Sequence, residues 1–141
     1  MEPIKIESGE QQIPIERDGV STGEITINPG DTLFMERFYK AFGDITNKLE
    51  SHRTDEAPDI EKQFELIKGI NAFMRERIDY AFGAGASQIA FGDVVSYDFG
   101  IYIQFIDQIN KIIEPARASA LNKYIPTSQK PPRRTRKPRK R

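Results

Sequence analysis

The sequence predicts a mainly α-helical protein with an N-terminal β-hairpin and a basic C-terminal tail. Isoleucines alternate with polar residues near the amino terminus, and apolar residues recur at helical spacing over most of the remaining chain. The composition then changes abruptly at Pro126. We therefore divide the chain into a hairpin segment (1–30), a helical domain (31–126) and a tail (127–141) that we expect to be disordered.

The hairpin is predicted from isoleucines that share one face of an extended chain: Ile13, Ile15, Ile25 and Ile27. Asp18-Gly19 lies between the two pairs and favours a turn with positive φ. We expect Ile15 to pair with Ile25 across a five-residue loop of about residues 18–22, with Pro14 on an edge strand.

A lone hairpin is marginally stable in water, so we expect this one to pack on the helices that follow. Ile4 and Ile6 show the same period-two spacing. They predict a third short strand before the hairpin.

The apolar spacing predicts a first helix over 31–50 and a polar linker over 51–58. Pro58 suits the first turn of a second helix, because the amide that proline lacks has no helical partner there. Gly83 is expected to end this helix. Gly69 lies inside it and costs about 1 kcal/mol relative to Ala, which suggests close backbone packing at that point.

A glycine-rich connection, 83–93, leads to a third helix expected over 94–124. Pro115 removes one backbone hydrogen bond and predicts a kink or a break near 111–115. The bundle is therefore small and contains three helices, or four if Pro115 divides the last one.

The third helix carries two adjacent apolar stripes, more than a helix needs when it packs on one neighbour. The simpler explanation is a fully internal helix, which we favour for the second helix. For the third helix the surplus predicts a groove for a partner helix or for a second copy of the chain. The predicted face consists of Phe99, Tyr102, Phe105, Ile109 and Ile112.

Charge is divided sharply along the chain, although the formal net charge is zero. All 21 acidic residues and 13 of the 21 basic residues precede residue 127, which gives that part a charge of −8. The tail carries the remaining eight bases: Lys130, Arg133, Arg134, Arg136, Lys137, Arg139, Lys140 and Arg141. Such a tail is suited to nucleic-acid phosphates, to an acidic protein surface, or to a solubilising role alone.

Few residues suggest catalysis. The chain has no cysteine, and its one histidine, His52, lies in the polar linker. Asp79, Asp93 and Asp98 leave a carboxylate and metal site as a third hypothesis, but acids near helix starts ordinarily interact with the helix dipole. The glycine-rich connection follows a helix and lacks the lysine of a phosphate-binding loop. We therefore expect a non-enzymatic protein with no cofactor.

Short motifs resemble those of a family of small tail proteins from siphophages and prophages of Gram-positive bacteria, the tail assembly chaperones encoded near the tape measure protein. The matching segments are Asn28-Pro29-Gly30-Asp31-Thr32, Ile78-Asp79-Tyr80-Ala81-Phe82-Gly83, Phe91-Gly92-Asp93, Ile112-Ile113-Glu114-Pro115 and Leu121-Asn122-Lys123-Tyr124-Ile125-Pro126. The resemblance spans about 28–141 and brings no catalytic residues.

The resemblance implies a mainly helical chaperone that coats the tape measure protein and recruits tail-tube subunits. It implies a protein of the host cytoplasm that is absent from the mature virion. No stretch reaches the about 20 apolar residues that span a bilayer, so we expect no membrane partner. A homo-oligomer and a nucleic-acid-binding accessory protein that uses the basic tail stay open as alternatives.

Overall fold

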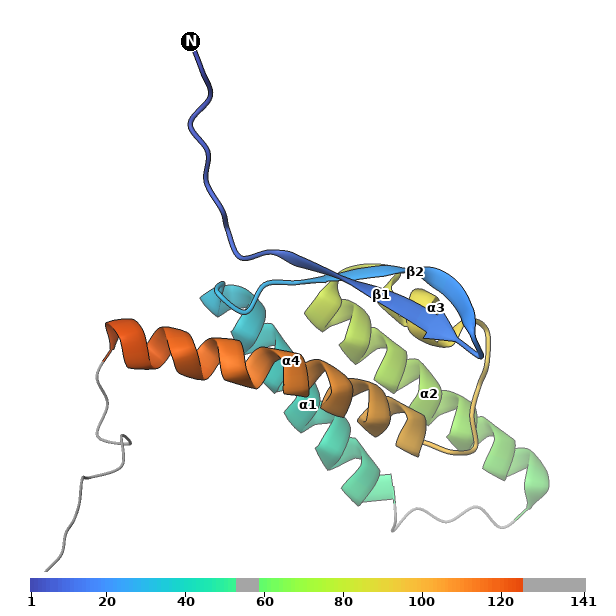
Figure 1. Ribbon diagram of the computed structural model, residues 1–141. Coiled ribbons are helices and arrows are strands. Elements are labelled where there is room, and N and C mark those ends of the chain that lie inside the picture. Colours follow the sequence, from blue (N-terminus) through green and yellow to red (C-terminus); the bar gives the residue numbers. More distant parts are fainter. Residues whose placement is uncertain (53–58, 126–141) are drawn as a thin grey trace, which may run out of the picture.

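The computed structural model describes residues 1–52 and 59–125, so the predicted disordered tail lies outside the described residues. The elements in chain order are β1 (Gln11–Arg17), β2 (Val20–Ile27), α1 (Thr32–His52), α2 (Ile60–Phe82), α3 (Ala86–Phe91) and α4 (Gly100–Tyr124). Helices α1 and α2 lie side by side, α4 crosses them, and the hairpin covers one end together with α3 (Figure 1). The predicted fold class, a small helical bundle with an N-terminal hairpin, is confirmed.

The hairpin is present, but its register differs from the predicted one. Ile13 pairs with Ile25 and Ile15 pairs with Gly23, so the predicted pairing of Ile15 with Ile25 is wrong. The five-residue loop is replaced by the two-residue turn Asp18-Gly19, with φ of 54° and 80°, which suits the twist of the strands. A bulge after Ile15 takes up the extra residue. The isoleucines still share the inner face.

The predicted third strand does not form. Ile4 and Ile6 are 89% and 81% exposed, and residues 1–10 contain no strand. Figure 1 shows this segment projecting from the body. Gly9 has φ of 89° and turns the chain outward before β1, so the isoleucines meet no strand edge of their own subunit.

The first two helices lie within two residues of their predicted positions. Helix α1 extends through His52, which was predicted to lie in the polar linker, and Pro58 lies outside the described residues, before the cap of α2. Asp59 caps α2, because its carboxylate accepts the amide of Lys62 at 2.8 Å. The expected close packing at Gly69 is wrong, since a Cβ built there would meet nothing within 4 Å.

The fourth helix arises from the glycine-rich connection and not from Pro115. The Asp79 carboxylate accepts the amide of Ser87 at 2.8 Å, which stabilises the first turn of α3. Helix α4 begins at Gly100, later than expected, and continues past Pro115 to Tyr124. Pro115 and Lys111, whose carbonyl lacks its helical partner, are both exposed on α4.

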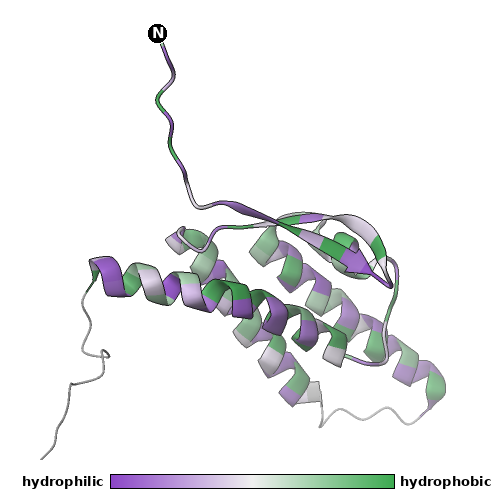
Figure 2. Ribbon diagram, viewed as in Figure 1, coloured by the Kyte–Doolittle hydropathy of each residue, from purple (hydrophilic) through white to green (hydrophobic). Residues whose placement is uncertain are grey.

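The core lies where the helices and the inner face of the hairpin meet, and Figure 2 shows hydrophobic positions along each helix. Phe38 is fully buried at its centre, with ring contacts to Phe34, Phe42 and Phe82. The largest fully buried side chains are Tyr102, Phe38, Ile27, Ile45, Ile70, Met74, Ile78, Ile106, Ile113 and Asn71. The hairpin and the helical domain thus contribute to one core.

Candidate partner-binding groove

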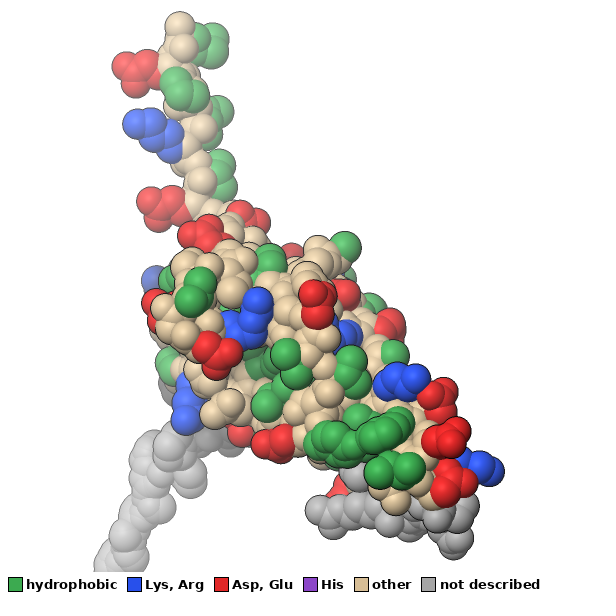
Figure 3. Space-filling view, turned by 90° about the vertical axis from the view of Figure 1, so that its right-hand side faces the viewer, with side chains coloured by type: hydrophobic (Ala, Val, Ile, Leu, Met, Phe, Trp, Pro, Cys, Tyr) green, Lys and Arg blue, Asp and Glu red, His purple; other side chains and the backbone are tan. Residues whose placement is uncertain are grey.

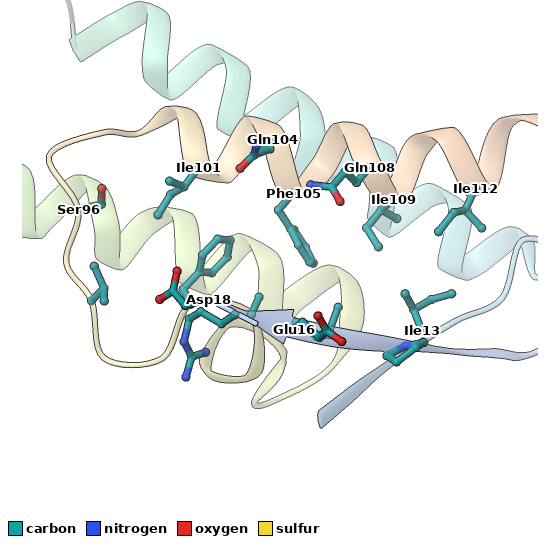
Figure 4. A pocket seen from close by; sticks show the side chains of 16 residues that line it. Ile13, Glu16, Asp18, Ser96, Ile101, Gln104, Phe105, Gln108, Ile109 and Ile112 are labelled. Atoms are coloured by element: carbon teal, nitrogen blue, oxygen red, sulfur yellow. The ribbon is translucent and has the colours of Figure 1, made fainter. Parts of the chain in front are cut away.

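A groove of about 490 Å³ lies between α4 and β1, and Figure 4 shows side chains from both elements directed into it. Its lining comprises Ile13, Pro14, Ile15, Glu16, Arg17, Asp18, Ala90, Phe91, Val94, Ser96, Ile101, Gln104, Phe105, Gln108, Ile109 and Ile112. Most of the lining surface is apolar. This volume falls in the range of ordinary ligand and peptide sites.

The α4 wall is one face of the helix. Ile101, Phe105 and Ile112 recur at near-helical spacing and point from α4 toward β1 (Figure 4). Phe105 packs edge-on against Phe82 and Phe91, with ring centroids 5.5 Å apart in each pair. This wall is therefore held rigid from behind while its outer side remains accessible.

The opposite wall is the main-chain edge of β1. Six consecutive residues, 13–18, line the groove, and no residue of β2 does. Since neighbouring side chains of a strand point to opposite faces, a continuous run places the strand edge itself in the groove. The predicted edge position of Pro14 agrees with this, because proline has no amide to offer a neighbouring strand.

Two hydrogen bonds fix the hairpin on α3. Arg17 donates from Nη1 to the carbonyl of Ile89 at 3.0 Å, and the Thr22 hydroxyl donates to the same carbonyl at 2.7 Å. Gly92, with φ of 63°, lies directly against Arg17, and a Cβ there would come within 2.9 Å of the guanidinium. These contacts set the distance between β1 and the rest of the body.

The segment before α4 is held by Asn71, which is 2% exposed. Its amide donates to the carbonyl of Ser96 at 2.9 Å and its oxygen accepts the Ser96 amide at 3.0 Å. The Tyr102 hydroxyl donates to the same oxygen, and burial raises the pKa of that hydroxyl. Arg75 binds the carbonyl of Val94 at 2.6 Å. The groove is thus largely preformed.

A second polar cluster joins α4 to α1 beyond the groove. The Tyr39 hydroxyl donates to Glu114 at 2.7 Å, and Arg117 forms an ion pair with Glu114 at 2.8 Å. The hydrogen bond from Tyr39, with help from Arg117, lowers the pKa of the Glu114 carboxyl. Burial is the main cause that raises the pKa of Tyr39. The cluster fixes the position of the second half of α4.

The five residues of the predicted apolar face lie in different surroundings. Tyr102 is fully buried and Ile109 is 3% exposed, so both belong to the core; Ile109 also reaches the floor of the groove. Phe99 is half-buried and packs against the core without lining the groove. Phe105 and Ile112 do line it, and Ile112 is 38% exposed. The eight basic residues of the tail, between Lys130 and Arg141, lie outside the described residues.

The sequence reasoning missed Ile101 and the β1 edge. Ile101 belongs with Phe105 and Ile112 to the second stripe of α4, and this stripe forms the groove wall. The first stripe contains Tyr102 and packs into the core. The sequence signal was therefore present in the second stripe, but the predicted face mixed the two.

The acids considered for a metal site have separate local roles. Asp79 caps α3, Asp93 accepts from Gln88 Nε2 at 2.9 Å, and Asp98 accepts the amide of Gly100 at 2.8 Å. Within the described ranges, no three side chains of the metal-binding types gather. The metal hypothesis thus gains no support from these positions.

A second apolar area lies away from the groove. Figure 3 shows apolar side chains gathered over the start of α2 and the segment before α4. Phe64 and Tyr97 are 44% and 66% exposed and meet edge-on at 6.2 Å between ring centroids. Ile60 is also exposed. None of these three residues lines the groove.

The fold and the groove define a small helical domain with a preformed, largely apolar groove. Residues 21–140 match the model of a family of unknown function (DUF6673), and the chain belongs to this family. The match begins inside β2, so β1 and the segment before it precede the matched range. Neither the curated proteins nor the solved structures contain a match. Among the described helices, none is both long enough and apolar enough to cross a membrane.

Proposed function

We propose that this protein is a non-enzymatic phage tail assembly chaperone that holds a helical segment of the tape measure protein in the groove between α4 and β1. The observation that carries the proposal is a preformed groove whose accessible wall is the second apolar stripe of α4. The resemblance to tail assembly chaperones supplies the client. In this role the protein acts in the host cytoplasm, helps to recruit tail-tube subunits and is absent from the mature virion.

The dimensions of the groove suit a short amphipathic helix. The wall from Ile101 to Ile112 spans 11 residue steps, or roughly 17 Å at 1.5 Å per residue. A client helix of about three turns covers this length and offers apolar side chains at i, i+4 and i+7. A tape measure protein, being long and helical, contains many such segments.

The test is binding of the full chain to the tape measure protein encoded in the same genome. Ile112→Asp places a charge on the groove wall at a side chain that is 38% exposed, so the fold is retained. We expect about a tenfold or greater loss of affinity, equivalent to about 1.4 kcal/mol or more. Leu33→Asp, at a 64% exposed position on α1, is the matched control and should bind normally. Equal binding by both variants would exclude the groove as the client site.

The basic tail is proposed as an electrostatic tether for protein partners. Removal of residues 127–141 deletes eight positive charges. We expect client binding to persist but to become less sensitive to salt, because the tail contribution is screened at high ionic strength. An unchanged salt dependence would exclude the tether.

A nucleic-acid-binding accessory protein is the second candidate, and the observation that favours it is the tail with eight bases and no acid. In this case affinity for a labelled DNA duplex falls steeply with salt and disappears with the tail. Fluorescence anisotropy of the full chain and of the chain without residues 127–141 separates the two functions. The chaperone proposal expects weak duplex binding and intact client binding.

A further inference from the structure

The N-terminal arm, defined as residues 1–8, carries apolar side chains with no place in its own subunit. Met1, Ile4 and Ile6 are all strongly exposed, and Figure 1 shows the arm pointing away from the body. Ile4 and Ile6 are two residues apart, so an extended chain turns both to the same side. Lys5 then points to the other side.

The direction of the arm is set by its junction with β1. Gly9 has φ of 89°, and a Cβ there would lie 3.1 Å from Oδ1 of Asn28. The same oxygen accepts the amide of Gly30 at 3.0 Å. The junction therefore packs on the turn that precedes α1, and it sends the arm outward instead of back along β1.

The groove offers the arm a strand edge to pair with and an apolar wall to cover its isoleucines. Its β1 wall is an open strand edge, and its α4 wall presents Ile101, Phe105 and Ile112. Strand addition to an exposed edge supplies main-chain hydrogen bonds, and alternate side chains enter the adjoining apolar space. Pro14 removes one donor from this edge, so the side chains must supply much of the binding.

We propose that the arm of one copy of the chain lies along β1 in the groove of a second copy, with the exchange made in both directions. Ile4 and Ile6 face α4, on the same side as Ile13 and Ile15. Alternation then places Lys5 on the outer face of the hairpin, where Glu16 is exposed. Opposite charges on neighbouring strands stabilise the pair.

The exchange gives a closed two-fold dimer, because each subunit has one arm and one groove. It covers the exposed isoleucines and the groove at the same time. It also makes dimer formation and client binding mutually exclusive at that groove. The inference stands on the arm and the groove alone and does not depend on the identity of the client.

Disulfide trapping tests the contact directly. The chain has no cysteine, so only the introduced thiols can form a disulfide, and a tag on one variant distinguishes the mixed disulfide from those between like chains. An Ile6→Cys protein is mixed with an Ile112→Cys protein and oxidised, and an Ile4→Cys protein is treated in the same way. We expect a covalent dimer from each mixture. Ile6→Cys mixed with Leu33→Cys is the control. Leu33 is exposed on α1 but does not line the groove, so this mixture should give little dimer.

Light scattering of the full chain over a concentration series gives the second measurement. We expect the apparent mass to double with increasing concentration, and the Ile4→Asp/Ile6→Asp variant to stay monomeric. These substitutions lie in a projecting arm and leave the core intact. A wild-type chain that is monomeric throughout would overturn the proposal, as would a variant that dimerises normally. So would an Ile6→Cys/Ile112→Cys chain that forms its disulfide only within a monomer.

Discussion

Two neighbouring faces of α4 are both apolar, yet they lie in different surroundings. One face contains Tyr102, Ile106 and Ile113, each fully buried against the rest of the bundle. The other contains Ile101 and Ile112, which line the groove. The difference arises outside α4, because the hairpin lies far enough from this second face to leave it accessible. Apolar character alone therefore does not distinguish a core face from an accessible face.

The largest difference between the faces is expected in stability. Ile106→Ala leaves a cavity in the core and should lower the free energy of unfolding by about 2–5 kcal/mol. Ile112→Ala removes a side chain that is 38% exposed and should cost clearly less. Chemical denaturation of both variants measures the difference. Equal losses would mean that the groove face is as firmly packed as the core face.

Loss of the Asn71 hydrogen bonds, which position the segment before α4, should have the next largest effect on the free energy of unfolding. Asn71→Ala removes the partner of the Ser96 main chain and of the buried Tyr102 hydroxyl. Leaving such groups unpaired costs about 1–3 kcal/mol. Asn47→Ala, at an exposed position on α1, is the matched control. If the two variants unfold at the same denaturant concentration, Asn71 does not hold the segment before α4.

Two glycines should give opposite changes in stability. Gly92→Ala forces a residue with a side chain into φ of 63° and against Arg17, at a cost of about 1–3 kcal/mol. Gly69→Ala enters open space on a helix and should stabilise by about 1 kcal/mol. Thermal unfolding measures both. A neutral Gly92→Ala variant would show that the hairpin can shift on α3, and the groove would then not be rigid.

The smallest expected effect concerns pH. The pKa of Glu114 is lowered in the folded protein, mainly by the hydrogen bond from Tyr39. The ionised Glu114 carboxylate therefore stabilises the folded protein at pH values above its pKa in the unfolded chain. This stabilisation is lost as the pH falls through the lower pKa of Glu114 in the folded protein. Tyr39→Phe should reduce this acid-dependent loss by less than about 1 kcal/mol, since the ion pair is partly exposed.

The measurement is the free energy of unfolding from neutral to acid pH. Tyr124→Phe serves as the control, because Tyr124 is 72% exposed. A Tyr39→Phe variant with the same pH profile as the wild-type chain would mean that Tyr39 does not set the charge state of Glu114.

Local signals were sufficient to predict most of the fold. The Asp18-Gly19 turn and the alternating isoleucines define the hairpin, and the helical spacing defines α1 and α2 within a few residues. Helix α3 was missed because its start depends on a carboxylate from α2, at Asp79. Pro115 was expected to kink or break the last helix, but α4 continues through it to Tyr124, and Pro115 lies on the exposed side where the lost bond costs least.

The groove was only partly predictable. A surplus of apolar surface on α4 was evident from the sequence, and two residues of the predicted face, Phe105 and Ile112, line the groove. Which stripe is covered depends on where the hairpin rests. That position is set by contacts of Arg17 and Thr22 with Ile89, which are 72 and 67 residues apart in sequence. Such long-range contacts leave no periodic signal in one sequence.

Isoleucine methyl NMR tests the central claim most directly, because the groove, the arm and the second apolar area each contain isoleucine. The full chain is titrated with a tape measure protein fragment that contains an amphipathic helix. We predict that the methyl signals of Ile13, Ile101 and Ile112 shift in the complex, while that of Ile60 stays unchanged. A shift of Ile60 with no change at the groove isoleucines would contradict the account and place the client on the surface formed by α2 and the segment before α4.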